Sequence, residues 1–487
     1  MKNVLRFVLT TVFGLTLATS VPAAPPEPQG APPVTGPPAV LTPSTATTMK
    51  RITDAALASP RAWELLAELC DDIGHRLSGS PGLDEAIAWA LARLKAAGHE
   101  NVRAEPVQVP KWVRGEESLW LESPRRRLSL LGLGGSIGTP PDGVTARVVV
   151  VADEAALEAR AAEVKGAIVL FNNKMPPHHP EKGPGYGDAV RFRARGPALA
   201  ANYGAVGVLV RSVTARSLYT PHTGATSTRE GPPPIPAAAI PLEDAELLSR
   251  LDRRGKKPVV TLRMGASDHG LVPSANVVAE LRGGDRPEEI VVISGHLDSW
   301  DVGQGAHDDG SGVVMAMASL DLLRALGLTP RRTIRVVLWT NEENGLRGAF
   351  GYAEAHAAEL ASHVAAIEAD TGCFEPVGYR VEHRDPATSV EAVALMETLL
   401  APLAPVGATH AELGFSGADL IPLREAGVLL LGHHMDLATY FDFHHTAADT
   451  LDKVDPAHLA QNVATMAATA WALAETEALP LRTELAP

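Results

Sequence analysis

Acidic residues gather around a histidine in the stretch ISGHLDSWDVGQGAHDDGSGVV, residues 293–314. An apolar run ends at His296, and four aspartates follow before an apolar helical pattern begins: Asp298, Asp301, Asp308 and Asp309. Carboxylates this close together repel one another unless positive charge or solvent lies among them. No Lys or Arg occurs between Gly295 and Leu323. The stretch therefore predicts either a metal site or a group of hydrated carboxylates.

Further acidic and histidine residues follow other apolar runs of the chain. Glu342 and Glu343 come after TIRVVLWTN, and Asp370 comes after VAAIEA. GVLLLGHHM precedes FDFHHTAADT, which supplies His444 and His445. Ligands bind beyond the carboxyl ends of the strands in an open parallel sheet, so we expect these residues to meet at one sheet edge. Helix caps and loop polar residues would explain one or two of these clusters, but not all of them.

The residue types indicate which metal and which chemistry to expect. Histidine and carboxylate without thiolate suit Zn²⁺, Co²⁺ or Mn²⁺. Two neighbouring divalent ions need a shared carboxylate, and they can hold a water or hydroxide and polarise a carbonyl. Of Glu342 and Glu343, one can bind metal while the other takes the proton from that water. Asp298 is placed to accept a hydrogen bond from the ring of His296 and fix its orientation.

Short, almost continuously apolar runs alternate with helical patterns from about residue 275 onward. The runs include ANVVAELRG, EEIVVISG, TIRVVLWT, VAAIEAD and GVLLLGH, and the helical patterns include SGVVMAMASLDLLRALG and DPAHLAQNVATMAATAWALAET. This alternation predicts an α/β fold with a mainly parallel sheet and helices on both faces. Upstream, two amphipathic helices are expected to end at Gly74 and Gly98, and the strand VRAEPVQVP is expected to end at Pro110.

Residues 112–272 have a different character, with short strands separated by loops rich in Gly and Pro. We interpret them as a β-rich domain inserted into the first, because a structureless loop of this length is uncommon. The catalytic domain would then comprise residues 46–111 and 273–487. Cys70 and Cys373 are too few for a disulfide framework, and two separate buried cysteines are expected.

The N-terminus carries targeting and linker patterns rather than a fold. Residues 1–23 have basic residues, an apolar run and small residues, which is typical of a secretory signal peptide. Residues 24–45 are predicted to be a Pro-rich linker. The mature chain is therefore expected to be secreted or periplasmic, with no later membrane-spanning segment. The net charge of −14 argues against nucleic acid or an anionic membrane as the main partner.

The motifs HLDSWD, GAHDDGSG, TNEENGLRGA, IEADTG and HHTAADT resemble metallopeptidase family M28 over about residues 50 to 475. The resemblance implies a zinc-exopeptidase (phosphorylase/hydrolase-like) fold with two Zn²⁺ ions, which Co²⁺ or Mn²⁺ could replace. The inserted segment resembles a protease-associated (PA-like) domain, chiefly through GAIVLFNN, GAVGVLV and IPAAAIPLEDAELL. The family also suggests a homodimer.

The resemblance also implies a role for each site residue. His296 and Asp370 would bind one zinc ion, Glu343 and His445 the other, and Asp308 would bridge the two. Glu342 would be the general base, and Asp298 would orient His296. His445 is preferred to His444 because the family's ligand stands four residues before the Asp of the closing DT pair, here Asp449. Asp308 is preferred to Asp309 because it is the first Asp of the DDG element.

The function expected from these residues is that of a secreted dizinc metallo-exopeptidase acting on dipeptides or short peptides. A metal-bridging hydroxide would attack the scissile carbonyl after Glu342 takes its proton. An aminopeptidase acting on longer peptides remains open. So do a receptor-like binding protein on the same fold and a glutaminyl cyclase, which normally uses one zinc ion and generally lacks the inserted segment.

Overall fold

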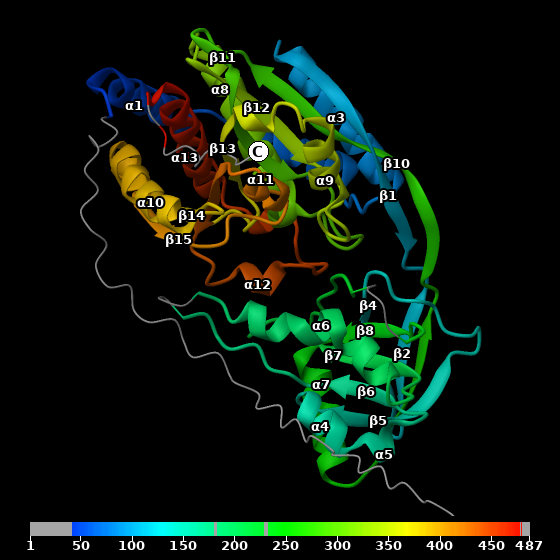
Figure 1. Cartoon of the computed structure of the whole chain (residues 1–487). Coiled ribbons are helices and arrows are strands. Elements are labelled where there is room, and N and C mark those ends of the chain that lie inside the picture. Colours follow the sequence, from blue (N-terminus) through cyan, green and yellow to red (C-terminus); the bar gives the residue numbers. More distant parts are fainter. Residues whose placement is uncertain (1–40, 180–182, 228–231, 478, 480–487) are drawn as a thin grey trace, which may run out of the picture. The chain divides into compact units, whose positions relative to one another are not determined.

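Two eight-stranded sheets organise the part of the chain that the computed structural model describes, residues 41–179, 183–227, 232–477 and 479 (Figure 1). The first sheet has the strand order β1-β10-β12-β11-β13-β16-β14-β15. Its strands are β1 (Glu100–Val113), β10 (Ser267–Leu281), β12 (Arg332–Trp339), β11 (Arg286–His296), β13 (His363–Glu368), β16 (Leu429–Met435), β14 (Pro376–Glu382) and β15 (His410–Leu413).

The centre of this sheet is parallel and its flanks are mixed. β12, β11, β13 and β16 run parallel, whereas β1 with β10, β10 with β12 and β14 with β16 pair antiparallel. β14 and β15 also pair in parallel, so four of the seven strand pairs are parallel and three are antiparallel. The α/β class is therefore confirmed, with a parallel centre inside a mixed sheet. The parallel strands end together, because His296 pairs with Trp339 and Glu368 pairs with Gly432. Residues that follow these strands must therefore emerge at the same edge.

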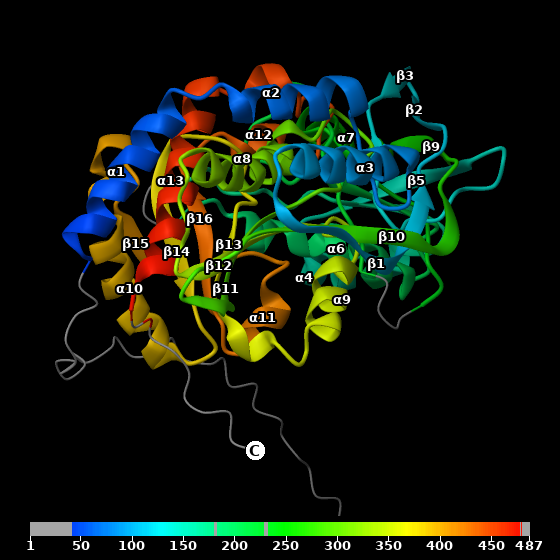
Figure 2. The same cartoon turned by 90° about the horizontal axis from the view of Figure 1, so that it is seen from above.

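Helices cover both faces of the first sheet (Figure 2). On one side lie α1 (Pro43–Leu57), α2 (Arg61–Ala67), α3 (Pro81–Ala96), α8 (Ser311–Ala325), α10 (Pro386–Leu400) and α13 (Pro456–Glu475). On the other lie α9 (Arg347–Ala355) and α11 (Ile421–Glu425). Short helical turns complete this part: η1 (Glu68–Ile73), η2 (Ala306–Gly310), η3 (Leu360–Ser362), η4 (Ala401–Val406), α12 (Tyr440–Phe443) and η5 (Leu451–Lys453).

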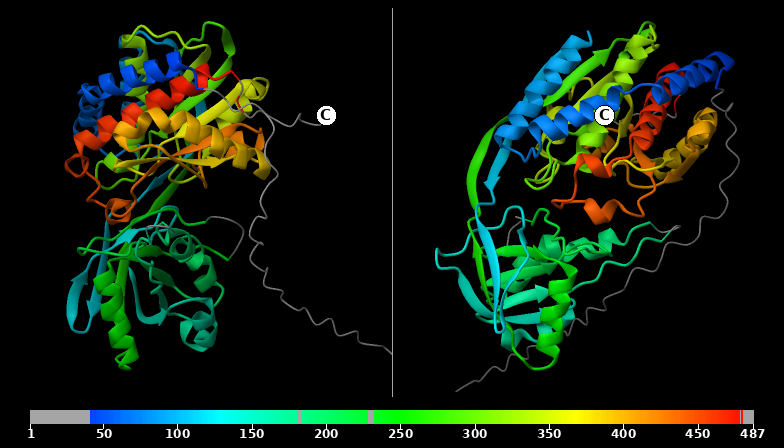
Figure 3. Two further views of the ribbon diagram at one scale, coloured as in Figure 1. Left: turned by 90° about the vertical axis from the view of Figure 1, so that its left-hand side faces the viewer. Right: turned by 180° about the vertical axis from the view of Figure 1, so that it is seen from behind.

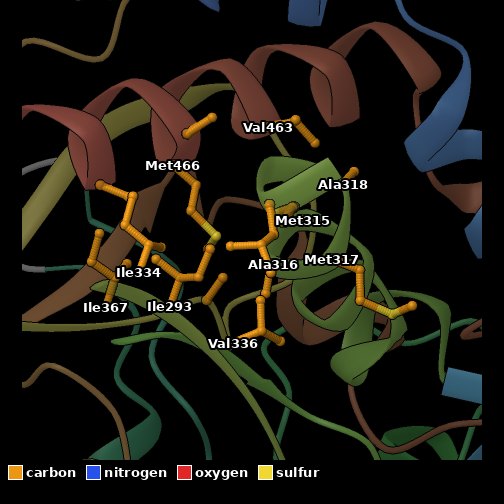
Figure 4. Close-up of a cluster of buried hydrophobic side chains, with 14 of the residues drawn as sticks. Ile293, Met315, Ala316, Met317, Ala318, Ile334, Val336, Ile367, Val463 and Met466 are labelled. Carbon is orange, nitrogen blue, oxygen red and sulfur yellow. The ribbon is translucent and has the colours of Figure 1, made fainter. Parts of the chain in front are cut away.

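Alternate residues of the central strands enter different cores, as the twofold repeat of a strand requires. Ile293 and Val336 pack toward α8 and α13, whereas Val292 and Val337 pack toward α9 and α11. Figure 4 shows the first of these cores, where Met315 of α8 and Met466 of α13 lie over the sheet side chains. Burial on both faces explains why these strands are almost continuously apolar in sequence.

The N-terminal helix begins earlier than the sequence predicts. α1 starts at Pro43, and the Thr42 hydroxyl caps it by accepting a hydrogen bond from the Thr45 N–H at 3.1 Å. Residues 43–45 therefore belong to a helix rather than to the predicted linker. The predicted signal peptide, residues 1–23, and residues 24–40 of the predicted linker lie outside the described residues.

The predicted end of strand β1 at Pro110 is wrong. β1 continues to Val113, and a register shift between Pro110 and Trp112 marks where the proline interrupts its pairing. β1 forms an edge of the sheet, and edge strands tolerate residues that lack an N–H donor. The two predicted helix ends are confirmed, because Gly74 and Gly98 follow helical segments with a φ of +79° each.

The second sheet draws its strands from residues 117–264, within the segment predicted to be inserted. Its order is β3-β2-β9-β5-β6-β7-β8-β4. The strands are β3 (Arg125–Leu128), β2 (Glu117–Glu122), β9 (Val259–Met264), β5 (Val144–Val151), β6 (Ile168–Phe171), β7 (Gly207–Arg211), β8 (Ala237–Ile240) and β4 (Leu131–Gly132). The β1–β10 pair carries the chain into and out of this sheet.

This segment is richer in helix than the sequence indicates (Figure 3). It contains α4 (Glu154–Ala159), α5 (Ala161–Val164), α6 (Tyr186–Ala201) and α7 (Leu242–Arg253). α6 was missed because Gly196 and Pro197 interrupt its helical pattern. Its Phe192 nevertheless stacks on Phe171 of β6, with ring centroids 4.9 Å apart. Tertiary packing here overrides weak local helix propensity.

The second sheet packs against the loop that follows β11. Trp300 lies so close to Gly134 that a Cβ there would be 2.1 Å from its ring. Arg114, just beyond β1, forms an ion pair with Asp301, with Nε 2.9 Å from Oδ2. Asp301, which the sequence left without a clear role, therefore joins the two sheets.

One described stretch, Pro386–Val406, has the length and apolar composition of a membrane span, which the sequence analysis did not anticipate. Nearly half of it is buried, and Leu395, Met396 and Leu399 lie in the core that covers the first sheet. Contact of α10 with β14 and β15 therefore accounts for part of its apolar character. Cys70 and Cys373 are both free and buried, as predicted.

Truncating Ile293 should destabilise the core that supports the carboxyl edge of the parallel strands. We expect Ile293→Ala to lower the free energy of unfolding by about 2–5 kcal/mol, because it leaves a cavity between the sheet and α13. Val390→Ala on α10, where the side chain is 51% exposed, should change stability by no more than about 0.5 kcal/mol. Urea unfolding of both variants tests this. Equal losses in the free energy of unfolding would contradict the placement of Ile293 in the core.

Candidate metal centre

The structure brings all the predicted site residues together at the carboxyl edge of the parallel strands. They are His296 at the end of β11, Asp298 just after it, Asp308 in η2 before α8, Glu342 and Glu343 after β12, Asp370 after β13, and His445 after α12. The strand ends that carry His296, Glu342, Glu343 and Asp370 are aligned by the sheet register. The helical turns η2 and α12 bring Asp308 and His445 to the same place.

A first group of donors forms around His296. Its Nε2 lies 3.2 Å from Oδ1 of Asp308 and 3.2 Å from Oδ1 of Asp370. Its Nδ1 donates to the backbone carbonyl of Asp298 at 3.0 Å. Because the carbonyl oxygen can only accept, Nδ1 donates in this bond, and Nε2 is the nitrogen that faces the two carboxylates. One nitrogen and two oxygens thus converge from three different segments.

A second group of donors forms around His445. Its Nε2 lies 3.2 Å from Oδ2 of Asp308 and 3.0 Å from Oε2 of Glu343. Its Nδ1 donates to the carbonyl of Thr223 at 3.2 Å, so that Nε2 is again the nitrogen that faces the carboxylates. His444 stacks on His445, and its Nε2 is 3.7 Å from Asp308. The shorter distance and the contact with Glu343 favour His445 over His444 as a ligand.

Asp308 belongs to both groups, one through each carboxylate oxygen. Its backbone N–H donates to Asp449 at 3.0 Å, and Asp449 also accepts from the N–H of His307 at 2.7 Å. Oδ2 of Asp308 and Oε1 of Glu343 are buried, and neither accepts a hydrogen bond from any described residue. Buried polar atoms are normally paired, so these two oxygens indicate a missing positive partner.

The charges of the centre are not balanced within the protein. Burial, reinforced by the Asp308 carboxylate, raises the pKa of Glu343 to about 7. Burial also raises the pKa of Glu342 well above its usual range, and nearby Asp370 raises it further. Burial alone would raise the pKa of Asp308, but the rings of His296 and His445 hold it well below its usual range.

No Lys or Arg forms an ion pair with these carboxylates in the part of the chain that the structure describes. Each of the two groups offers one imidazole nitrogen and two carboxylate oxygens. Three such ligands with a further position left open are typical of a catalytic divalent metal site. The donor set therefore fits two divalent cations that share Asp308.

Asp309 fixes the backbone rather than offering a free ligand. Its Oδ2 accepts from the N–H of His296 at 2.9 Å, and its Oδ1 accepts from the N–H of Gly312 at 3.0 Å. A Cβ at Gly312 would lie 2.0 Å from the carbonyl oxygen of Ala369, so only glycine fits there. Although Asp309 lies near His296 and Asp370, both of its oxygens are occupied by backbone donors.

The expected hydrogen bond between the Asp298 carboxylate and the His296 ring is wrong. The ring donates to the backbone carbonyl of Asp298, and its Nδ1 is 3.9 Å from the carboxylate. The carboxylate instead accepts from the N–H of Glu342 at 3.0 Å, the N–H of Glu343 at 3.4 Å and the Ser78 hydroxyl at 3.1 Å. Asp298 therefore holds the turn that carries the two glutamates.

Sequence reasoning missed the residues that support the ligands from a distance. Asp449, which fixes Asp308, was noted only as part of the DT pair. Thr223 and Arg193 come from the segment of the second sheet and touch His445, 222 and 252 residues away along the chain. No local pattern in the sequence could have indicated these contacts.

Comparison with known proteins agrees with this geometry. The profile of "Peptidase family M28" matches residues 276–470. Carboxypeptidase Q of Mus musculus is 42% identical over 418 residues, covering 86% of each chain. The solved structure of the Peptidase M28 precursor from Shewanella amazonensis SB2B has a TM-score of 0.84 and 37% identity, covering 90% of this chain and 98% of its own. BSAP, a zinc aminopeptidase from Bacillus subtilis, shares the fold with a TM-score of 0.64 at 19% identity, covering 86% and 96%.

The two adjacent histidines should differ in their effect on metal binding. We expect His445→Gln to lower the metal content by about one ion per chain, because three donors are needed at each site. His444→Gln is the matched control and should keep the wild-type content. Metal analysis of the purified proteins after dialysis tests this. If only His444→Gln lost an ion, His444 and not His445 would be the metal ligand.

Asp298→Asn should impair catalysis without emptying the site. The amide cannot accept all the hydrogen bonds from Ser78, Glu342 and Glu343, so the turn carrying the glutamates loosens. We expect kcat to fall by about 10–100-fold, as is typical for groups that orient a metal site. The measurement is steady-state kinetics with metal analysis. Complete metal loss would instead point to a role in holding His296.

Proposed function

The chain belongs to peptidase family M28 and is a metallo-exopeptidase related to carboxypeptidase Q, and on this premise we propose that it hydrolyses dipeptides or other short peptides with two zinc ions. The observation that carries the proposal is the double role of Asp308, whose two oxygens face His296 and His445. A carboxylate shared in this way offsets the repulsion between two neighbouring cations.

Each zinc site would use ligands already described. His296 and Asp370 would hold one ion, Glu343 and His445 the other, and Asp308 both. When bound, such ions polarise the scissile carbonyl and acidify a water molecule. Backbone bonds keep both histidines in the tautomer that can ligate, since each Nδ1 donates to a carbonyl oxygen.

Glu342 is the residue suited to move the proton. Its carboxylate accepts no hydrogen bond from any described residue, whereas its backbone N–H is held by Asp298 at 3.0 Å. Burial and neighbouring carboxylates raise its pKa, so it can accept a proton at neutral pH. Glu342 would take the proton from the attacking water and return it to the leaving amine of the substrate.

Contacts from the second sheet favour short substrates. The backbone N–H of Thr223 donates to the carbonyl of His445 at 3.0 Å. His222 Nδ1 donates to the carbonyl of His444 at 2.8 Å. The segment with His222 and Thr223 therefore lies directly against His444 and His445, where it restricts the approach of a long or folded peptide. This supports an exopeptidase acting on dipeptides rather than an enzyme that cleaves within proteins.

Three accompanying proposals come from the sequence. The signal-peptide pattern in residues 1–23 supports export to the periplasm or the exterior. The resemblance of the inserted segment supports a PA-like domain, and the family resemblance supports a homodimer. Size-exclusion chromatography with light scattering, and N-terminal sequencing of the mature protein, would test the oligomeric state and the cleavage point.

Glu342→Gln should separate metal binding from catalysis. The amide cannot accept the proton, so we expect kcat on dipeptides to fall by about 10²–10⁴-fold while two metal ions remain bound. Hydrolysis of a dipeptide panel by wild-type and variant protein, with metal analysis of both, tests this. A wild type that binds two metals and cleaves no peptide would overturn the proposed function, as would a variant that keeps wild-type activity.

A further inference from the structure

Arg76 is a fully buried cation next to the metal centre. It is 0% exposed and lies in the loop between η1 and α3. No carboxylate forms an ion pair with it in the part of the chain that the structure describes, and its guanidinium donates only to backbone carbonyls there. Burying a charge is costly, so a buried arginine without a paired carboxylate needs an explanation.

The guanidinium joins the two ends of the loop between β11 and η2. Its Nε donates to the carbonyl of Leu297 at 2.8 Å, at the start of this loop. At the other end, Nη1 donates to the carbonyl of Gln304 at 2.7 Å and Nη2 donates to the carbonyl of Gly305 at 3.0 Å. A guanidinium is planar and its donors are fixed relative to one another. One rigid group therefore sets the distance between the two ends.

Each end of this loop leads directly to a predicted metal ligand. His296 immediately precedes Leu297, and Asp308 stands three residues after Gly305. Asp308 belongs to both groups of donors, so its position relative to His296 determines how far apart two bound cations lie. The bonds of Arg76 thus act on the spacing of the metal pair.

The rest of Arg76 is also fitted to this loop. Its backbone N–H donates to the Ser299 hydroxyl at 3.0 Å, and the Ser299 N–H donates to the Arg76 carbonyl at 3.3 Å. Nη1 donates as well to the carbonyl of Gly74, which ties the side chain to the end of η1 at 2.7 Å. A Cβ at Gly310 would lie 2.6 Å from the carbonyl oxygen of Gly305 and 3.5 Å from Nη2. Glycine there leaves room for the bond between them.

The charge of Arg76 faces the aspartates that hold the ligand segments. Three buried carboxylates accept hydrogen bonds from the backbone of these segments: Asp298, Asp309 and Asp449. Burial lowers the pKa of the Arg76 guanidinium, whereas the charges of these aspartates raise it. Arginine stays protonated in proteins, so Arg76 brings positive charge to a stretch that has no Lys or Arg between Gly295 and Leu323.

We infer that Arg76 is a positioning residue of the metal centre, which fixes the spacing of His296 and Asp308 and thereby the spacing of the two cations. This inference rests on the proposed function and adds how the chain sets the geometry of the metal pair. Arg76 is fully buried and donates to no predicted ligand side chain. Its replacement should therefore change metal affinity and kcat rather than KM.

Arg76→Lys separates the fixed geometry of the guanidinium from its charge. Lysine keeps the charge, but its single ammonium group has three donors and cannot serve four carbonyls. We expect Arg76→Lys to bind the more weakly held Zn²⁺ ion about 10–100-fold less tightly, as is typical when a group that orients metal ligands is changed. Competition with a chelator of known Zn²⁺ affinity measures this. Arg76→Met, which also removes the charge, should bind still more weakly.

Arg332→Lys is the matched control for losing a buried guanidinium. Arg332 is 1% exposed, and its Nη1 donates to the carbonyls of Leu473 and Ala474 at 3.2 and 3.4 Å. It begins β12, whereas Glu342 follows the other end of that strand. Both lysine variants should lower the free energy of unfolding. Arg332→Lys should nevertheless keep Zn²⁺ affinity and kcat within about threefold of wild type, because distant sites act independently.

Electron paramagnetic resonance of the Mn²⁺-loaded protein reports the spacing of the ions directly. Two Mn²⁺ ions that share a carboxylate couple magnetically, whereas separated ions give the spectrum of isolated Mn²⁺. We expect the coupled spectrum from wild type and from Arg332→Lys. At the same metal content, Arg76→Lys should give a large share of the isolated-ion spectrum. A role of Arg76 in stability alone would leave the coupling unchanged.

Steady-state kinetics on a dipeptide at saturating Zn²⁺ separates positioning from substrate contact. We expect kcat of Arg76→Lys to fall by about 10–100-fold, because the metal ligands are no longer held at the right spacing. KM should stay within about threefold of wild type, since a fully buried residue does not touch the substrate. A rise in KM with unchanged kcat would contradict the inference.

Ser299→Ala tests the same loop without changing a buried charge. It removes the hydroxyl that accepts from the Arg76 N–H and leaves the guanidinium in place. We expect Zn²⁺ binding to weaken by about 2–10-fold, as loss of a single hydrogen bond allows. If Arg76→Lys does not fold, this variant decides the question, and wild-type Zn²⁺ affinity in it would overturn the inference.

The remaining outcomes separate this inference from the proposed function. If Arg76→Lys keeps wild-type Zn²⁺ affinity and a fully coupled Mn²⁺ spectrum, Arg76 does not set the metal spacing, and the peptidase stands without it. Equal losses of affinity in Arg76→Lys and Arg332→Lys would reflect general destabilisation and would also overturn the inference. If the wild type binds one metal ion or none, the dizinc proposal fails and takes the inference with it.

Discussion

The repulsion among the buried carboxylates around Asp308 is the constraint on which this structure depends. Asp308, Glu343 and Asp370 meet near two imidazole rings, and two of their buried oxygens accept no hydrogen bond from any described residue. Such a cluster is stable only when cations offset its charge. The surrounding chain fixes these groups through their backbone, as Asp449 does for Asp308 and Asp298 does for Glu342.

The parallel centre of the first sheet supplies the geometry that this cluster needs. β11, β12, β13 and β16 end at matched positions, so the turns that follow them converge. Helices bury both faces of these strands, so most side chains along them are apolar and the candidate metal ligands lie at or beyond the strand ends. The rigid core thus holds charged residues at a place where flexible loops alone could not keep them together.

The second sheet contributes to the centre rather than standing apart from it. Thr223 fixes the tautomer of His445, His222 binds the carbonyl beside it, and Arg193 brings a buried positive charge to the same loop. Trp300 and Asp301, in the loop after β11, add contacts with Gly134 and Arg114. Two segments far apart in the chain therefore meet at His445.

The sequence by itself determined the α/β class, the central strands and the set of metal-binding candidates, because each depends on local pattern. A continuous apolar run marks a strand buried on both faces, and His or Asp directly after it marks a strand end. Helix α6 and the passage of β1 through Pro110 depended on packing and sheet position, which local propensity does not contain. Only the tertiary structure decided that the Asp298 carboxylate holds the turn with Glu342 and Glu343 instead of the His296 ring, and that Arg193 lies beside His445. These facts join residues from 44 to 252 positions apart, and no spacing rule along the chain can specify such contacts.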